Sequence, residues 1–159
     1  QESSWGGKEI TETADIINEA KTLAFQDVEN HFLRNENLFY QYFRVREKQF
    51  EILERMLKIV SSISLTVEQN KMIANYINEV SEHIHPGNTA IIYLEKLYRL
   101  KVEFCNMELP KTREEFEARA SLLQFINEME QYLHIKSSFR GLDKIIKKSR
   151  HKAKQWKTN

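Results

Sequence analysis

The sequence predicts an all-α fold, an antiparallel up-and-down helical bundle of four to five long helices. Along most of the 159 residues, apolar side chains recur every three or four positions, which is the helical period. The chain has only four glycines and two prolines, whereas a many-stranded β fold needs a turn about every ten residues. Short polar breaks separate the periodic segments, and short connections make consecutive helices antiparallel.

The first two helices differ in the width of their apolar faces. The first is expected to begin near Glu9 and to end before the polar break at 34–37. Its inward row consists of Ile10, Ala14, Ile17, Ala24, Val28 and His31. The second helix carries two adjacent rows: Leu38, Tyr42, Val45, Gln49, Ile52, Met56, Ile59 and Ile63, and beside them Phe39, Phe43, Phe50, Leu53, Leu57 and Val60. Two rows predict a wide buried face and a central position in the bundle.

Two capping-box patterns mark later helix starts. Thr66 with Gln69, and Thr112 with Glu115, each place a hydroxyl three residues before a side chain that can reach back. The third helix is expected to turn Ile73, Ile77, Val80 and Ile84 inward. The fourth uses Tyr93, Leu97, Leu100 and Phe104. The fifth runs to about Phe139, with Ala118, Leu122, Phe125, Met129 and Tyr132 on one stripe and Gly141 near its end.

Between the third and fourth helices, the sequence His85-Pro86-Gly87-Asn88 predicts a turn. The proline disfavours the helical conformation at His85, and Gly87 can adopt positive φ. Asn88, or Thr89 after it, can cap the next helix.

Charge divides the chain into an acidic body and a basic end. Residues 140–159 contain eight basic residues and one aspartate, a net charge of +7, so the remainder carries −6. We expect a flexible lead-in at 1–8, a bundle at 9–141 and a basic tail at 142–159. The tail is either solvated or binds an anionic membrane surface or, without sequence preference, nucleic acid. Its candidate contact residues are Lys144, Lys147, Lys148, Arg150, Lys152 and Lys154.

The chain offers no segment that crosses a membrane and no basis for a disulfide. Its longest stretch without Asp, Glu, Lys or Arg runs from Ile84 to Leu94, far short of the roughly 20 apolar residues that a span requires. The single cysteine, Cys105, cannot form an internal disulfide and is expected to be buried or semi-buried filler. Because the sequence begins with Gln1, we expect a fragment or a processed product.

Catalytic and cofactor motifs are missing from the sequence. It contains no Ser/His/Asp arrangement, no glycine-rich phosphate loop and no Cys/His spacing typical of a metal site, so we expect no enzyme and no cofactor. Glu79 and His83 share a helix face and could offer two metal ligands, with Glu82 and His85 nearby. The alternative is a histidine satisfied by a loop hydrogen bond.

A ligand site is suggested by the second helix. Arg44 and Arg46, near Tyr40 and Tyr42, could clamp a carboxylate beside an aromatic wall. The alternative is that these arginines, with Arg55 further on, form salt bridges to glutamates of neighbouring helices.

Several stretches in order resemble the C-terminal domain of the bacterial putative aromatic acid exporter family. They are 42–49 continuing into 54–56, then 60–66, then 81–89 with the His85–Asn88 turn, and 109–117. The resemblance implies a helical domain on the cytoplasmic face of the cell membrane, joined to a membrane-spanning part of the same polypeptide.

We therefore expect an accessory domain of a membrane exporter of aromatic acids that self-associates or regulates the membrane part. Two alternatives remain: a sensor that binds an aromatic carboxylate, and a protein that binds an anionic membrane surface or, without sequence preference, nucleic acid through the basic tail. No specific nucleic-acid partner is expected.

Overall fold

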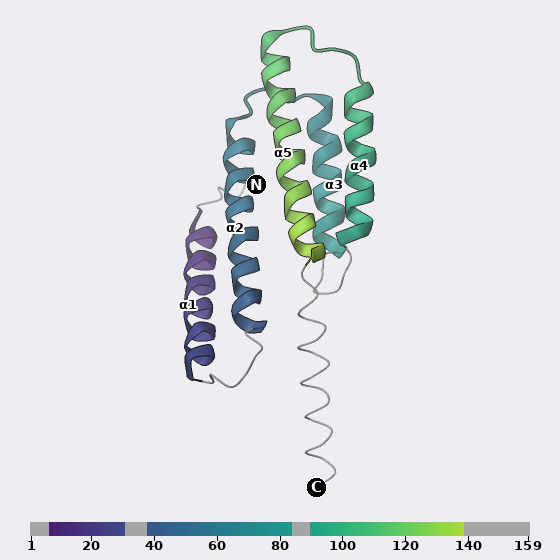
Figure 1. Cartoon of the computed structure of the whole chain (residues 1–159). Helices are drawn as coiled ribbons and strands as arrows, with labels where there is room; N and C mark the ends of the chain where they lie inside the picture. Colours follow the sequence, from purple (N-terminus) through teal and green to yellow (C-terminus); the bar gives the residue numbers. More distant parts are fainter. Residues whose placement is uncertain (1–6, 31–37, 84–89, 139–159) are drawn as a thin grey trace. The chain divides into compact units, whose positions relative to one another are not determined.

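A computed structural model of the chain describes residues 7–30, 38–83 and 90–138, all of whose regular structure is helical (Figure 1). The helices are α1 (Lys8–Asn30), α2 (Leu38–Ser62), α3 (Glu68–His83), α4 (Ala90–Asn106) and α5 (Arg113–Ser138). The predicted all-α fold with up to five long helices is confirmed. Within the described ranges, no helix combines the length and apolar character that a membrane span requires.

The chain forms two compact units, and within the described residues the boundary between them falls inside α2, between Glu51 and Ile52. The first unit contains α1 and the beginning of α2. The second unit contains the end of α2 together with α3, α4 and α5. The predicted division at residues 8 and 141 stays a prediction, because it falls at or near the ends of the described part.

In the first unit, α1 lies beside the beginning of α2 as a helical hairpin (Figure 1). Ala24 is buried, and the predicted inward residues Ile10, Ala14, Ile17 and Val28 are half-buried. Two side-chain contacts join the helices: an ion pair between Lys21 and Glu47, and a tilted ring contact with 5.6 Å between the centroids of Phe25 and Tyr40.

The second unit is an up-and-down bundle whose core contains residues of every helix in it (Figure 1). The predicted inward residues of α3, α4 and α5 that lie in the described part are buried or half-buried, as expected. The buried cluster consists of Ile52, Met56, Ile73, Tyr76, Val80, Ala90, Tyr93, Leu97, Leu122, Phe125, Ile126, Met129 and Leu133. Burying so many apolar side chains, at about 1.5–3 kcal/mol each, is the main favourable contribution to the stability of this unit.

A tyrosine pair connects α3 and α4 inside this core. The Tyr76 hydroxyl donates to the carbonyl oxygen of Tyr93 at 2.9 Å, and the two rings meet edge to face with centroids 6.5 Å apart. Burial raises the pKa of Tyr76 well above its usual value, with smaller contributions from Glu79 and Tyr93. The phenol therefore stays protonated and keeps its hydrogen bond at physiological pH.

Of the two predicted capping boxes, only the second forms. At α5, the Glu115 amide donates to Thr112 Oγ1 at 3.1 Å, and Glu115 Oε2 accepts from the Lys111 amide at 2.8 Å. At α3 the prediction was wrong, because Asn70 Oδ1 accepts from the Val67 amide at 2.8 Å and thereby takes the capping role.

The displaced Gln69 turns into the core of the second unit instead. Its side chain is fully buried, and its Nε2 lies 3.2 Å from the sulfur of Met107. Burial of this side chain between the ends of α3 and α4 replaces the local contact that the sequence pattern favoured.

The wide buried face expected for α2 is also wrong. Its first row is buried at Gln49, Ile52 and Met56. In the second row, hereafter the outer row of α2, Phe39 and Val60 are 55 % and 50 % exposed, and Leu53 is exposed as well. The predicted central position of α2 rested on burial of both rows, so the structure does not support it.

Candidate functional site

The arginines and tyrosines of α2 form two separate pairs. In the first, the Arg46 guanidinium carbon lies 5.0 Å from the centre of the Tyr42 ring, and Arg46 Nε donates to Tyr42 Oη at 2.9 Å. In the second, the Arg44 guanidinium carbon lies 5.9 Å from the centre of the Tyr40 ring. Both pairs have a spacing of four residues, which places their members on one helix face.

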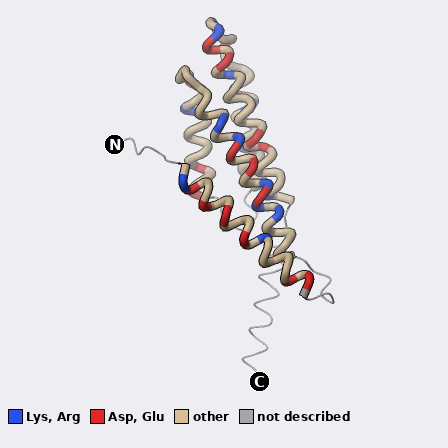
Figure 2. The backbone as a smooth tube through the Cα atoms, turned by 90° about the vertical axis from the view of Figure 1, so that its left-hand side faces the viewer, with Lys and Arg blue, Asp and Glu red and all other residues tan. Residues whose placement is uncertain are grey.

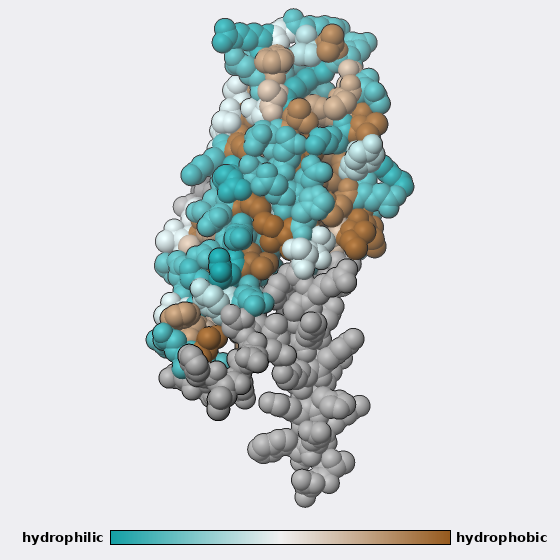
Figure 3. All heavy atoms as spheres, in the orientation of Figure 1, coloured by the Kyte–Doolittle hydropathy of each residue, from teal (hydrophilic) through white to brown (hydrophobic). Residues whose placement is uncertain are grey.

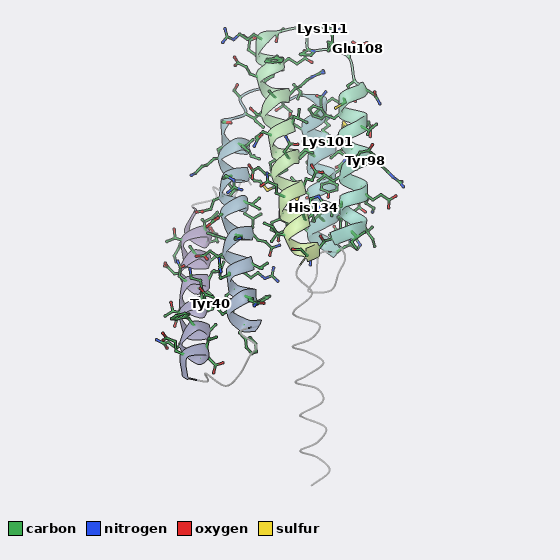
Figure 4. The ribbon with its side chains drawn as sticks, in the orientation of Figure 1. Tyr40, Tyr98, Lys101, Glu108, Lys111 and His134 are labelled. Atoms are coloured by element: carbon green, nitrogen blue, oxygen red, sulfur yellow. The ribbon has the colours of Figure 1, made fainter. Side chains whose placement is uncertain are left out.

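The two pairs project from opposite sides of α2. Residues two positions apart on an α-helix are separated by about 200° around its axis. Tyr40, labelled in Figure 4, packs against Phe25 of α1. The structure therefore brings each arginine to its own tyrosine and does not gather the four predicted residues into one clamp. Whether either pair binds a carboxylate stays a prediction.

Gln49 adds a buried polar group beside the Arg46 pair. Its side chain is only 4 % exposed, and its Oε1 accepts from Arg46 Nη1 at 3.2 Å. Within the described part of the chain, its Nε2 has no hydrogen-bond partner. A buried donor left unpaired costs about 1–3 kcal/mol, so this amide is a ready donor for an acceptor such as a carboxylate. The sequence signal for Gln49 was a polar residue within an apolar row.

Arg55 forms an ion pair with a buried glutamate of a neighbouring helix, as the salt-bridge interpretation expected. Its Nη2 lies 2.8 Å from Oε2 of Glu128 on α5, and the other carboxylate oxygen accepts from Gln124 Nε2 at 3.1 Å. Glu128 is buried, whereas Arg55 is partly exposed. With both oxygens bonded, this carboxylate supports the bundle and is not a free general base.

The candidate metal ligands Glu79 and His83 are engaged in other contacts. His83 is exposed, and its Nδ1 lies 2.9 Å from the carbonyl oxygen of Glu79. The Glu79 carboxylate forms an ion pair with Lys96, and the hydrogen bond to that carboxylate raises the pKa of Lys96. Among the described residues, no three His, Cys, Asp or Glu side chains form a cluster that could hold a metal ion.

Two groups of predicted residues lie outside the described ranges. One is the turn of His85, Pro86, Gly87 and Asn88, which includes a further candidate metal ligand. The other is the basic set Lys144, Lys147, Lys148, Arg150, Lys152 and Lys154. Binding of the basic set to an anionic surface stays a prediction.

Cys105 is exposed near the end of α4, so the expectation of a buried filler was wrong. The inward-facing positions of α4 are occupied by larger side chains such as Leu97 and Phe104, and Cys105 falls on the other side of the helix. This outer side is unusually apolar, since Ile91 and Tyr98 are 58 % and 68 % exposed, and Ile92 and Val102 are exposed too.

Charged residues are mixed along the surface, whereas some exposed hydrophobic residues cluster. Acidic and basic residues are interspersed along the described helices (Figure 2). Hydrophobic residues also reach the surface between hydrophilic ones, and some gather at the end of the second unit where α4 begins (Figure 3). Exposed apolar groups beyond scattered single residues are typical of interaction surfaces.

Comparison with known proteins gives consistent matches. The model of the family described as "Putative aromatic acid exporter C-terminal domain" matches residues 1–137. A relative from Bacillus subtilis (strain 168), "Uncharacterized protein YqjA", is 60 % identical over 141 residues, which cover 89 % of this chain and 44 % of the relative. The chain thus spans less than half the length of this curated relative.

The fold also recurs in a solved structure, described as "Crystal structure of putative membrane protein from Clostridium difficile 630". The TM-score is 0.76 at 24 % sequence identity, and the match covers 84 % of this chain and 79 % of the other. At this identity the similarity supports the fold alone.

Proposed function

Because the chain belongs to the family of C-terminal domains of putative aromatic acid exporters, we propose that it is a non-enzymatic accessory domain that associates with further copies of itself. In this proposal the domain lies at the cytoplasmic face of a bacterial membrane and follows a membrane-spanning part of the same polypeptide. Its association brings membrane parts together or biases their conformation.

One observation carries the proposal: hydrophobic side chains stay exposed on the outer faces of α2 and α4 although the second unit has a buried core of its own. Phe39, Leu53 and Val60 are exposed on α2, and Ile91 and Tyr98 are exposed on α4. Burying such groups on association stabilises the complex by about 25 cal/mol for each Å² removed from water. Between tethered copies this gain is opposed by a smaller entropic cost than between free ones.

The test is the mass of the chain in solution as its concentration rises. Light scattering on the purified chain from about 10 µM to about 1 mM covers the range of weak, specific association. We expect the weight-average mass to rise from that of a monomer toward that of a dimer. A monomeric mass throughout this range would falsify the proposed self-association.

A second candidate function, the sensing of an aromatic carboxylate, is favoured by the Arg46 pair. A carboxylate placed there could accept from the unpaired Gln49 Nε2 and from the Arg46 guanidinium while its ring lies near Tyr42. A guanidinium that donates to a carboxylate forms the strong, charge-assisted hydrogen bonds that are typical of anion recognition.

The matched control for this candidate is Arg44, which has its own tyrosine on the opposite side of the same helix. We expect benzoate and 4-hydroxybenzoate to raise the melting temperature of the wild-type chain and of Arg44→Ala, but not of Arg46→Ala. An equal response of the two variants, or no response of the wild type, would rule out sensing through Arg46.

A further inference from the structure

The outer side of α4 has the spacing of a coiled-coil seam. Ile91, Glu95, Tyr98, Val102 and Cys105 follow one another at intervals of four, three, four and three residues, and all five are exposed. We call these five residues the outer seam of α4. Tyr93, Leu97 and Leu100 occupy the other side of the helix, where they are buried or half-buried in the core.

This spacing indicates that the partner is another helix. In a coiled coil, residues with alternating intervals of three and four form the a and d positions, which interlock with the same positions of a facing helix. Figure 4 places Tyr98 midway along α4, and Lys101 reaches from the same helix to Asn127 and Glu130 of α5. The contacts with α5 thus occupy one flank of α4 and leave the seam itself uncovered.

The outer row of α2 is a weaker candidate for such pairing. Three of its six members, Phe43, Phe50 and Leu57, are already half-buried by the fold of the chain. In the outer seam of α4, every member is exposed. Its apolar members Ile91, Tyr98 and Val102 stay exposed, so pairing through α4 covers a row of side chains of which the fold of the chain buries none.

We propose that the outer seam of α4 binds the same seam of a second copy of this chain, with the two helices antiparallel about a two-fold axis that passes between Glu95 and Tyr98. The inference rests on the proposed self-association and names its surface and geometry. A two-fold interface uses the same patch on both copies, so the patch must be complementary to itself.

The outer seam of α4 is complementary to itself from Ile91 to Val102. In antiparallel coiled coils each a position faces a d position of the other helix. In the proposed register, Ile91 of each copy faces Val102 of the other, one such layer at each end of the contact. Glu95 of each copy faces Tyr98 of the other, in two central layers, where the phenol hydroxyl can donate to the carboxylate.

The charge of Glu95 in the seam and that of Arg99 beside the seam are complementary between copies as well. Within one chain, Arg99 Nη2 contacts Glu95 Oε1 at 2.6 Å, and both side chains are largely exposed. The two-fold axis brings Arg99 of the second copy to within one residue of the level of Glu95. In this register each Glu95 lies close to an arginine of the other copy. Such opposite charges favour a second copy over an apolar helix that lacks them.

The seam is short, so the pairing is weak in free solution. The 17 residues of α4 span about 25 Å, or little more than two heptads. An interface of this length lies at the low end of specific association, with an expected dissociation constant on the order of 100 µM. Tethering copies in one membrane raises their effective concentration to about the millimolar range, which is enough to populate the pair.

The first test exchanges the two charges between copies of the full chain. Glu95→Arg alone places arginine against Arg99 of the other copy, and Arg99→Glu alone places glutamate against Glu95. We expect each variant by itself to associate at least tenfold more weakly than the wild type in sedimentation velocity. An equimolar mixture of the two variants pairs arginines with glutamates and should regain the association as a heterodimer.

The matched control is the ion pair of Arg113 and Glu117 on α5, which has the same spacing and is also exposed. Arg113→Glu and Glu117→Arg, alone or mixed, should associate as the wild type does. Equal circular dichroism of all variants shows that the exchanged charges leave the fold intact.

The second test determines the orientation of the helices by disulfide formation in a Cys105→Ser background, which removes the single native thiol. Ile91→Cys mixed with Val102→Cys should give a covalent heterodimer, because facing seam positions have Cα separations in the range of about 4.4–6.8 Å that a disulfide needs. Either variant alone should cross-link poorly, since its two copies lie about 16 Å apart along the axis.

The outcomes separate this inference from the function on which it rests. If the wild-type chain stays monomeric, both fail. If it associates but the charge variants associate equally well, self-association stands and the α4 seam is wrong. Efficient cross-linking of Ile91→Cys to itself would establish a parallel pair and overturn the proposed antiparallel geometry.

Discussion

The two units of this chain are built from similar amphipathic helices but bury them to very different extents. In the second unit, thirteen hydrophobic residues from four helices form one buried cluster. In the described part of the first unit, the buried residues are Ala24 and Gln49, one of them small and the other polar. Leu23 and Phe39 of the first unit are exposed.

This difference shows that helical periodicity predicts where a helix forms and not how much it contributes to stability. In the second unit a helix such as α5 contacts several neighbours, whereas among the described residues of the first unit α1 packs against α2 alone. Segments with few buried apolar contacts open locally at a lower free energy than the global unfolding of the chain. We expect the first unit to be the part that opens first, and the following predictions test this from the largest effect to the smallest.

The largest effect is expected from removing a core side chain of the second unit. Leu133 on α5 is fully buried, so Leu133→Ala should lower the free energy of unfolding by about 3 kcal/mol through lost burial and the cavity left behind. Urea denaturation followed by circular dichroism measures the change.

Leu23→Ala in the first unit is the matched control. Leu23 is exposed, so this substitution should change the free energy of unfolding by less than about 0.5 kcal/mol. Similar losses for the two leucines would contradict the contrast between the units.

A smaller contrast is expected between two ion pairs, each joining two helices of one unit. Arg55→Met leaves the Glu128 carboxylate buried in the second unit with Gln124 as its remaining partner in this cluster, at a cost of about 2–3 kcal/mol. Lys21→Met removes a pair with Glu47 whose members are both partly solvated, at a cost of about 0.5–1 kcal/mol. Chemical denaturation in low and high salt measures both, and a larger loss for Lys21→Met would reverse the proposed ranking of the units.

The helix caps provide a third comparison. α5 begins with the reciprocal contacts of Thr112 and Glu115, whereas α1 begins with a backbone hydrogen bond from Ile10 to Gly7, which has positive φ. Thr112→Ala should lower the free energy of unfolding by about 1 kcal/mol. Lys8→Ala, at the exposed start of α1, should change the free energy of unfolding by only about 0.1–0.3 kcal/mol. Thermal melts of the two variants measure the difference.

The smallest effect concerns the pH dependence of the α5 cap. The hydrogen bond from the Lys111 amide lowers the pKa of Glu115, and Arg119 lowers it further. A carboxylate whose pKa is lower in the folded state stabilises the fold above its ordinary pKa, and this stabilisation is lost as the pH falls through the lowered value. Glu115→Gln should therefore be less stable than the wild type near pH 7, and the difference should shrink as the pH falls below the ordinary pKa of a glutamate and through the lowered value.

The control for the pH prediction is Glu114→Gln, in the same turn. Its side chain is exposed, so the difference from the wild type should be smaller and should vary less with pH. A stability gap for Glu115→Gln that is unchanged at low pH would show that the carboxylate charge is not what stabilises the cap.

Most of the fold could be predicted from the sequence because helices are specified locally. The inward residues expected for α4 and α5, such as Leu97 and Leu122, are in the core, and the Thr112 capping box forms. The prediction failed where residues distant in sequence compete for the same side chain. The Gln69 side chain contacts Met107 and does not form the expected cap. Phe39, Leu53 and Val60 in the outer row of α2 stay exposed because no neighbouring segment covers them in the described structure.

The candidate site followed the same pattern. The spacing of four residues between Tyr42 and Arg46, and between Tyr40 and Arg44, is local, and both pairs could have been read from the helical period. Burial of Gln49 with an unpaired amide depends on what surrounds α2 and had no sequence signal beyond one polar residue in an apolar row.

The sequence by itself determined the helical class, the family and the capped start of α5, because each depends on the order of side chains along a few turns of chain. Only the tertiary structure decided which apolar rows are covered, which ion pairs are buried and that the outer seam of α4 is exposed. Burial is a property of neighbours brought together from distant parts of the chain, and periodicity along one helix does not specify them.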